Sequence, residues 1–427
     1  MGLFDFLSRI FGGSPPAAGG APSPSRPVGT KKQAPENSYD LGGYFRRPKK
    51  RYRATFSYEP PKYVRNEPYA MARRAFYPQD DHQFVDKSAG YRPHVLAKYN
   101  LPQIRTPEEL ALWLAVPLKT LVWLADYYDD LWQEPARKKN HYHYKKVQKR
   151  SSGVRLIEAP KAILKTIQKR ILHEILDHVP AHPAAHGIRK GSSILSNASP
   201  HVGKKVVIKV DLADFYPRLV MKRVKAMFRA MGYNVEMCAW LAKLCTNKAG
   251  YDRDLPQFYY RRHLPQGAPT SPALANLCCF GLDVRLSGLA KKFNATYTRY
   301  ADDLTFSGGE DLASPERTAA LLWAVRKIIR DERFYANALK TRVLRKGTRQ
   351  IVTGVVVNQK LNVSRSEFDR LKAVLTNCVR KGPATQNRHK HPNFKAHLQG
   401  RVAHVTRLNP ARGAKLQRLL DKIAWAS

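Results

Sequence analysis

Acidic residues are scarce in this chain. The chain has 33 Asp and Glu but 75 Lys and Arg, so its 427 residues carry a formal net charge of +42. An enzyme acting on small neutral molecules gains nothing from such self-repulsion, whereas a polyanionic partner, either nucleic acid or an anionic membrane, compensates it. The basic residues are spread over the whole chain. This distribution favours a protein that cradles a long polyanion, with binding that weakens steeply with salt.

Cysteine is scarce as well. The spacing of the five cysteines matches no zinc pattern, and their odd number argues against a disulfide framework. We therefore expect a reducing, cytoplasmic compartment. No apolar run approaches the length of a membrane span. Residues 1–11 (MGLFDFLSRIF) are amphipathic but lack the basic start and long apolar centre of a secretion signal. They are either a helix that docks on a membrane surface or a partner, or a frayed terminus.

The first part of the chain has the composition of an appendage. Residues 12–36 are rich in Pro, Gly, Ala and Ser, which is typical of a linker. Residues 44–53 (YFRRPKKRYR) interleave basic and aromatic side chains, as a nucleic-acid arm or a solvated basic tail would. We predict that residues 1–95 form a basic, Pro/Gly-rich, disordered extension.

Helical structure is predicted to begin near Thr106. Thr106, Pro107 and Glu109 supply an N-cap, a proline at the first helical position and a capping-box acid. The apolar run that follows has helical spacing, and Pro117 should split it into two helices. Strands and helices alternate beyond residue 140, with hairpins, and this predicts the α+β class. The predicted strands are 142–149, 153–160, 205–210, 295–300, 304–306, 350–357 and 360–363, and the predicted helices are 164–178, 221–231, 235–245, 315–331, 365–380 and 410–425.

Three segments together predict chemistry: IKVDLADFYP (208–217), LPQGAPTSP (264–272) and YADD (300–303). Asp211 follows a very apolar strand, and Asp302 and Asp303 stand at a hairpin turn, so the carboxylates converge if these strands pair. An isolated Asp–Asp pair is usually only a turn, but carboxylates clustered in a basic protein need a cation. Hard oxygen ligands suit Mg²⁺. Two such ions can activate an attacking hydroxyl and stabilise a leaving pyrophosphate.

The same segments carry a resemblance to a known family. YADD after an aromatic-rich strand, an upstream V-D-L-x-D-F-Y and an intervening Q-G resemble the palm of reverse transcriptases. More narrowly, four features resemble the retron reverse transcriptases of bacteria. They are NASPH (197–201), Asn276 after LPQGAPTSP, LKT (339–341) and VTG (352–354). The resemblance covers roughly residues 100–427.

It implies a right-hand polymerase fold of the α+β class, with a helical N-terminal segment. Residues 96–362 would form fingers and palm, and residues 363–427 a basic helical thumb that grips RNA. About 65 residues past Asn362 are too few for a nuclease domain.

The resemblance also implies roles for single residues. Asp211, Asp302 and Asp303 would be catalytic and hold two Mg²⁺ ions, with Mn²⁺ as a possible substitute and the Leu212 carbonyl as a further ligand.

Seven residues would bind the incoming nucleotide. Asp214 would lie near the triphosphate, and Tyr216 would be the aromatic gate that blocks a 2′-OH. Gln266 and Gly267 would line the nascent base pair. The last three would contact phosphates: Arg155 as the fingers arginine, Lys161 as a weaker candidate, and Lys340 near the pyrophosphate. Arg155 as an ordinary surface arginine and Tyr216 as a core aromatic stay open as alternatives.

Five residues would recognise the RNA or grip the primer: Asn197 and His201 in one motif, and Val352, Thr353 and Gly354 in the other. Asn197 as a turn residue, His201 as a hydrogen-bonded surface histidine, and VTG as a strand end with a glycine turn stay open.

The function expected from the resemblance is copying part of a cognate structured noncoding RNA with dNTPs. Synthesis would start from a 2′-OH and yield a branched RNA–DNA hybrid, multicopy single-stranded DNA, in anti-phage defence with an effector protein. Three rivals remain. One is a group II intron or diversity-generating lineage, which NASPH and VTG disfavour. Another is RNA-dependent RNA synthesis, which Tyr216 disfavours. The last is a non-catalytic RNA-binding scaffold, for which the acids would be dispensable.

Overall fold

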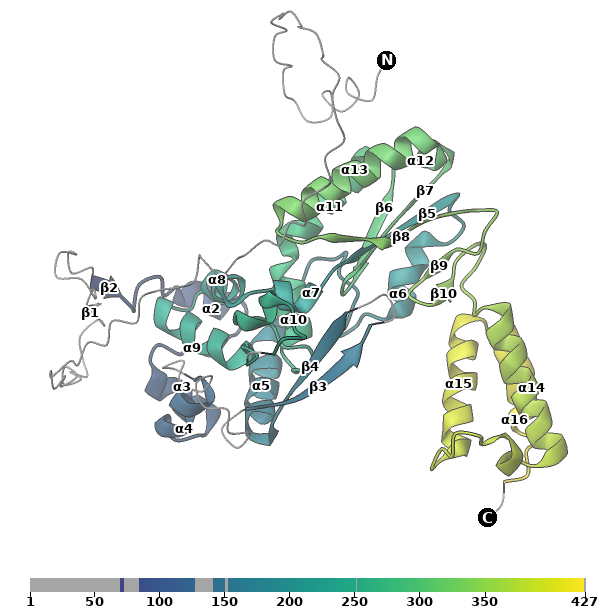
Figure 1. Cartoon of the computed structure of the whole chain (residues 1–427), viewed down its shortest axis with the longest axis horizontal. Coiled ribbons are helices and arrows are strands. Elements are labelled where there is room, and N and C mark those ends of the chain that lie inside the picture. The colour runs from purple at the N-terminus through teal and green to yellow at the C-terminus, as the bar shows by residue number, and fades with distance from the viewer. Residues whose placement is uncertain (1–69, 73–83, 127–140, 150–152, 251, 426–427) are drawn as a thin grey trace, which may run out of the picture. The chain divides into compact units, whose positions relative to one another are not determined.

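The computed structural model describes residues 70–72, 84–126, 141–149, 153–250 and 252–425 (Figure 1). The chain divides after Pro68 into two units, and all of the described residues belong to the second, Tyr69–Ser427. The segments 1–11, 12–36 and 44–53, and the disorder predicted for them, lie outside the described residues. Of the predicted extension the structure describes its last part, where β1 (Ala70–Ala72) pairs antiparallel with β2 (Phe84–Asp86).

The helical segment that follows contains α2 (Pro93–Lys98), α3 (Pro107–Leu114) and α4 (Leu118–Leu124). The cap predicted at Thr106 is confirmed, because its hydroxyl accepts a hydrogen bond from the Glu109 N–H at 3.2 Å. The Glu109 carboxylate accepts from the backbone N–H of Arg105 rather than of Thr106, at 2.7 Å. Pro117 separates α3 from α4, as predicted.

A long hairpin comes next. β3 (Tyr142–Gln148) pairs antiparallel with β4 (Val154–Pro160), which confirms both predicted strands. The predicted helix 164–178 is instead α5 (Ala162–Glu174), followed by a separate 3₁₀ turn over Leu176–His178.

A four-stranded antiparallel sheet organises the centre of this unit, in the order β6-β7-β5-β8. Its strands are β5 (Val206–Leu212), β6 (Thr296–Tyr300), β7 (Asp303–Gly308) and β8 (Ala336–Arg345). The sequence placed Asp211 just past the first of these strands, whereas the structure pairs it within β5. β8 was not predicted, because ANALKTRVLR is an edge strand with exposed and half-buried residues and no apolar run.

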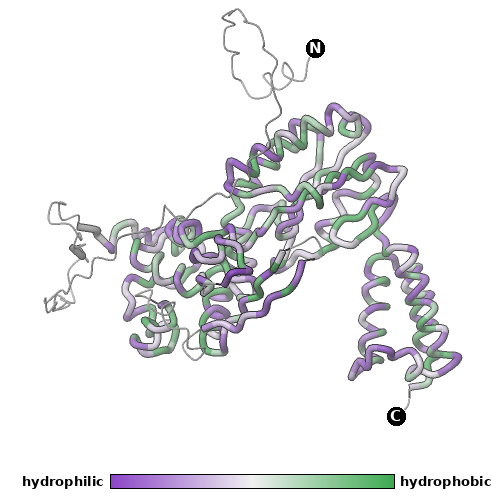
Figure 2. The backbone as a smooth tube through the Cα atoms, viewed as in Figure 1, coloured by the Kyte–Doolittle hydropathy of each residue, from purple (hydrophilic) through white to green (hydrophobic). Residues whose placement is uncertain are grey.

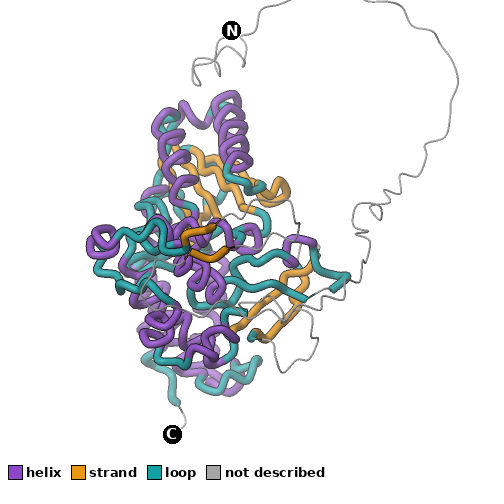
Figure 3. Tube along the Cα trace, turned by 90° about the vertical axis from the view of Figure 1, so that its left-hand side faces the viewer, coloured by secondary structure: helices purple, strands orange, loops and turns teal. Residues whose placement is uncertain are grey.

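Helices accompany this sheet, and some of them pack on it. α8 (Met221–Met231), α9 (Val235–Cys245) and α13 (Pro315–Asp331) have the predicted bounds. Figure 1 shows α11 (Phe280–Lys292) and α13 side by side along the sheet, and α11 packs on β6. Figure 3 shows both helices and strands in this unit, and the central sheet is antiparallel, which agrees with the predicted α+β class. The other helices here are α6 (Ile194–Ala198), α7 (Phe215–Arg218), α10 (Ser271–Cys278) and α12 (Glu310–Ala313).

The hairpin predicted from 350–357 and 360–363 is wrong. β9 (Ile351–Val352) pairs with β10 (Val355–Val356), so the turn falls within VTG itself. Thr353 and Gly354 have φ values of 44° and 83°, the left-handed backbone that tight hairpin turns require. Residues 360–363 contribute a single bridge, between Val356 and Asn362.

Three helices end the described chain: α14 (Arg365–Lys381), α15 (Phe394–Leu408) and α16 (Pro410–Leu420). Figure 2 shows hydrophobic and hydrophilic residues alternating along them. α15 was not predicted, although its buried residues 398, 402, 405 and 408 have helical spacing. The apolar sides of these helices share one core with Val352 and Val355 of the β9–β10 hairpin.

Among the described residues, no single helix has the length and apolar character needed to cross a membrane. The bent pair α10 and α11 meets those criteria by length and composition only.

Candidate active site

Strand pairing brings the three predicted acids to one end of the central sheet. Asp211 of β5 stands directly opposite Asp303 of β7, and the N–H of Leu212 donates to the Asp302 carbonyl at 2.9 Å. Tyr300 of β6 is paired with Asp303 across the same hairpin. The convergence that the sequence made conditional on strand pairing is therefore confirmed.

The acids repel one another. Burial, and after it the neighbouring carboxylates of Asp211 and Asp303, together raise the pKa of Asp302 to about 6. The pKa of Asp303 is also raised, first by burial and then by Asp211, against the opposing charge of Lys209. A group of carboxylates that resists ionisation in this way gains most from a cation placed among them.

A lysine supplies part of that positive charge. Lys340 Nζ lies 3.0 Å from Asp211 Oδ1 and 3.1 Å from its Oδ2. In the described part of the chain no three His, Cys, Asp or Glu side chains are grouped so as to hold an ion as they stand. The donor set nevertheless fits a hard divalent cation, since it consists of carboxylates whose repulsion such a cation would relieve.

A cavity of about 320 Å³ opens beside these acids. Eight of the residues predicted for the site line it, from β4, β5, α7, the β6–β7 turn, β8 and the loop before α10. They are Arg155, Asp211, Leu212, Asp214, Tyr216, Gln266, Asp302 and Lys340. The carboxylates of Asp211, Asp214 and Asp302 thus face the same space as the side chains of Arg155, Gln266 and Lys340. This arrangement suits a charged substrate bound together with a metal.

The comparisons with known proteins agree with this geometry. Residues 138–368 match the family described as "Reverse transcriptase (RNA-dependent DNA polymerase)". The Retron Mx65 reverse transcriptase of Myxococcus xanthus is 42% identical over 330 residues, which are 76% of this chain and 73% of that protein. The Retron Mx162 reverse transcriptase of the same organism is 37% identical over 77% of this chain and 69% of that protein. This chain belongs to the retron reverse transcriptases.

The enzyme is therefore an RNA-directed DNA polymerase with a reverse-transcriptase fold, from a family that generally uses divalent metal ions. Similarity to a solved structure is much weaker. Telomerase from Candida albicans, solved with a TWJ fragment of telomeric RNA, aligns with 69% of this chain and 58% of its own at 11% identity and a TM-score of 0.39. A similarity of that size is too weak to support a functional conclusion.

The aromatic residue of this reverse transcriptase's first acidic motif faces the cavity. Tyr216 lies on α7, and burial together with the Asp302 carboxylate raises its pKa to about 12, so the ring stays neutral. The preceding Phe215 points into the core and stacks on Phe334. Asp214 lines the cavity with a left-handed φ of 51°, and its carboxylate accepts from Lys149 Nζ at 2.6 Å.

Three of the eleven residues predicted for catalysis, metal or nucleotide binding lie outside the cavity lining. Asp303 stands opposite Asp211 but is not among the lining residues. Gly267 lies behind Gln266, where a Cβ would come within 2.9 Å of the Glu158 carbonyl oxygen. Lys161 precedes α5, and its N–H donates to the His141 carbonyl. Gly267 thus supports the wall of the site, and the structure does not place Lys161 in it.

Sequence reasoning did not assign Lys149, Tyr259 or Asn337, which line the same cavity, and it quoted Leu339, a further lining residue, only as part of LKT. Lys149 stands in the basic hairpin sequence YHYKKVQKR, which was a usable signal. Asn337 faces Asp211 across the sheet, but it lies on β8, a strand that the sequence did not reveal. Tyr259 reaches the site only through the chain's folding, and its hydroxyl accepts from the Leu156 N–H at 3.3 Å.

The two motifs predicted to recognise RNA meet inside the protein. Asn197 Nδ2 donates to Thr353 Oγ1 at 3.4 Å. Asn197, His201 and Val352 are fully buried, and Gly354 is exposed.

The alternative that His201 is a surface histidine is wrong, because its side chain is fully buried. Its ring bridges two strands of the sheet, with Nδ1 2.6 Å from Ser307 Oγ and Nε2 2.8 Å from Thr298 Oγ1. Any influence of the buried motif residues on RNA must act through the surface above them.

Proposed function

We propose that this reverse transcriptase copies part of its own structured noncoding RNA into branched multicopy single-stranded DNA, starting from a 2′-OH of that RNA. The similarity to two retron enzymes over three quarters of the chain supports the proposal, together with Asp211 and Asp302 in one cavity and Asp303 paired with Asp211 beside it. The net charge of +42 supports a long nucleic-acid partner.

The metal in this proposal is Mg²⁺, with Mn²⁺ as a substitute. Asp211, Asp302 and Asp303, with the Leu212 carbonyl, would hold two ions. When bound, the ions supply an activated primer oxygen and charge neutralisation at the departing pyrophosphate.

The other cavity residues act on the nucleotide. Arg155, exposed on β4, binds the triphosphate, and Gln266 contacts the nascent base pair. Lys340 is held beside Asp211, from where its ammonium group would contact the pyrophosphate. The ring of Tyr216 lies where it excludes a 2′-OH, so deoxynucleotides are selected.

The same proposal covers the C-terminal helices, the cellular compartment and the biological role. Residues 363–427 act as a basic helical thumb that grips a stem-loop of the RNA through its shape and phosphates. The enzyme works in the cytoplasm, which its free cysteine thiols suit. It serves anti-phage defence together with an effector protein, as the retron resemblance implies.

The deciding experiment is sequencing of nucleic acid that copurifies with the full chain. We expect one defined RNA joined through a 2′–5′ branch to DNA complementary to part of it. The matched control is Asp302→Ala with Asp303→Ala, which should copurify with the same RNA and no DNA. Unbranched DNA, or DNA in the control, would overturn the proposal.

A further inference from the structure

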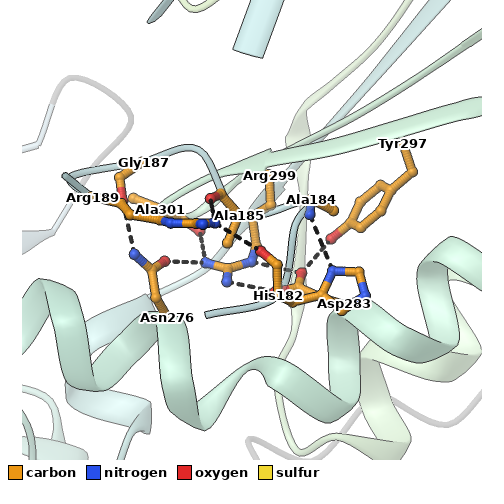
Figure 4. Close-up of polar contacts among 10 residues, drawn as sticks. All are labelled: His182, Ala184, Ala185, Gly187, Arg189, Asn276, Asp283, Tyr297, Arg299 and Ala301. Atoms are coloured by element: carbon orange, nitrogen blue, oxygen red, sulfur yellow. Dashed lines mark hydrogen bonds and ion pairs between the residues drawn. The ribbon is translucent and has the colours of Figure 1, made fainter. Parts of the chain in front are cut away.

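A buried arginine stands two residues before the catalytic turn. Arg299 lies on β6 and is fully buried. Burying a guanidinium is unfavourable unless every donor finds a partner. Asp283 of α11, itself fully buried, accepts from Arg299 Nε at 2.8 Å and from Nη2 at 2.7 Å (Figure 4). Two parallel hydrogen bonds of this kind fix the plane of the guanidinium.

The remaining guanidinium nitrogen reaches the catalytic turn itself. Arg299 Nη1 donates to Asn276 Oδ1 at 3.1 Å and to the main-chain oxygen of Ala301 at 3.2 Å. Ala301 has a φ of 53°, in the left-handed region that residues with a Cβ rarely adopt. It directly precedes Asp302. The carbonyl of a strained residue next to a catalytic acid is thus held by a buried cation.

The loop that contains Gly187 packs closely against the same turn. A Cβ built on Gly187 would lie 2.4 Å from the Ala301 nitrogen and 3.0 Å from the Tyr300 carbonyl carbon, so only glycine allows this approach. Asn276 Nδ2 donates to the Gly187 carbonyl at 2.8 Å. Asn276 therefore links the loop to Arg299.

The loop is braced along its length. The N–H of Arg299 donates to the Ala184 carbonyl at 2.7 Å, and the N–H of His186 donates to the Arg299 carbonyl at 2.8 Å. Arg189 Nη1 donates to two carbonyl oxygens at the start of the loop, both at 3.3 Å. Figure 4 shows Ala184, Ala185, Gly187 and Arg189 of this loop near Arg299.

We propose that Arg299 and Asn276 are positioning residues for DNA synthesis. Through the Ala301 carbonyl and the Gly187 loop they hold the turn so that the Asp302 carboxylate stays in register with Asp211. Asn276 lies on α10, directly after the loop whose Gln266 lines the cavity. The pair thereby couples the nucleotide-contacting loop to the acids.

Two variants test the proposal. Arg299→Lys keeps a positive charge against Asp283 but loses the planar fork that serves three partners at once. Asn276→Asp keeps an oxygen facing Arg299 and loses the donor to Gly187. The matched control is Leu286→Ala, a cavity mutation at a fully buried position on the same helix as Asp283, with no bond to the turn.

The kinetic readout is steady-state dNTP incorporation, corrected for active enzyme by burst titration. Because a displacement of about 1 Å costs about 10²-fold in rate, kcat should fall about 10²-fold in Arg299→Lys and about tenfold in Asn276→Asp. The KM for dNTP and the Kd for RNA should stay within about twofold, since ground-state contacts are kept. Leu286→Ala should lower the Tm while kcat per active site stays near wild type.

A second readout needs neither metal nor activity. Amide hydrogen exchange of the peptide 296–306 should quicken in both positioning variants and stay unchanged in the control. Unchanged kcat in both variants, or an equal loss of kcat in Leu286→Ala, overturns the proposal. So does faster exchange spread evenly over the whole sheet. If Arg299→Lys does not fold, Asn276→Asp decides alone on the same criteria.

Discussion

His201 should make the stability of this enzyme depend on pH. Its ring is buried between two strands, and burial lowers its pKa from 6.5 to about 3. In the unfolded chain the imidazole takes up a proton below about pH 6.5, whereas in the folded chain it stays neutral down to about pH 3. The unfolded state then binds more protons, so stability is complete above about pH 6.5 and is lost as the pH falls.

The size of this loss of stability depends on the difference between the pKa values of His201 in the folded and unfolded chain. Between the two pKa values each pH unit costs about 1.4 kcal/mol, so at pH 5 the free energy of unfolding is lower by about 2 kcal/mol than at pH 8. Against a typical total of about 5–15 kcal/mol this loss is easily measured. His201→Gln removes the titration but keeps an N–H donor and an oxygen acceptor for Thr298 and Ser307.

The assay is urea unfolding of both proteins between pH 8 and pH 5. Burial also lowers the pKa values of His141, His182 and His186, but these groups titrate alike in both proteins. The difference in pH dependence therefore isolates His201, and the wild type should lose about 2 kcal/mol more than the variant. If the free energy of unfolding varied with pH in the same way in wild type and His201→Gln, the reasoning would be refuted. RNA affinity at pH 8 should be the same, because the imidazole faces the interior.

The cavity and its walls support three further predictions. Tyr216→Ala should raise the ratio of rNTP to dNTP incorporation in primer extension, and an unchanged ratio would remove the gate role. Gly267→Ala should lower the free energy of unfolding by about 1–3 kcal/mol, because φ is +136° and the new Cβ would lie 2.9 Å from the Glu158 oxygen. Gly347→Ala, with open space around it, is the control, and equal losses would contradict the steric argument. The rate of dNTP incorporation should fall as the pH drops through about 6, because a protonated Asp302 is no longer a metal ligand. Raising Mg²⁺ should move that midpoint to lower pH, and a rate independent of pH there would exclude Asp302 as the titrating group.

Local signals in the sequence were sufficient for many elements and for the acids. The cap at Thr106, the break at Pro117 and the helix 315–331 depend on neighbouring residues only, so they could be predicted without the fold. The motifs around Asp211 and Asp302 are contiguous and specific, and family resemblance identified them for the same reason.

The tertiary structure decided what depends on residues far apart in the chain. β8 has no apolar run of its own, and only its pairing with β5 makes it a strand and brings Asn337 opposite Asp211. The VTG turn depends on the β9–β10 pairing. The burial of His201 could not be predicted from the sequence, because its polar partners, at positions 298 and 307, come from two strands distant in the chain.

Arg299 shows the same limit most clearly. In the sequence it is one basic residue among 75 Lys and Arg, with nothing to set it apart. Its partners are Asp283 on α11, Asn276 on α10 and the carbonyl of Ala301. A guanidinium is stable in the interior only where the folded chain brings such partners around it. The sequence therefore predicted the three acids, whereas only the fold placed Arg299 and its partners beside their turn.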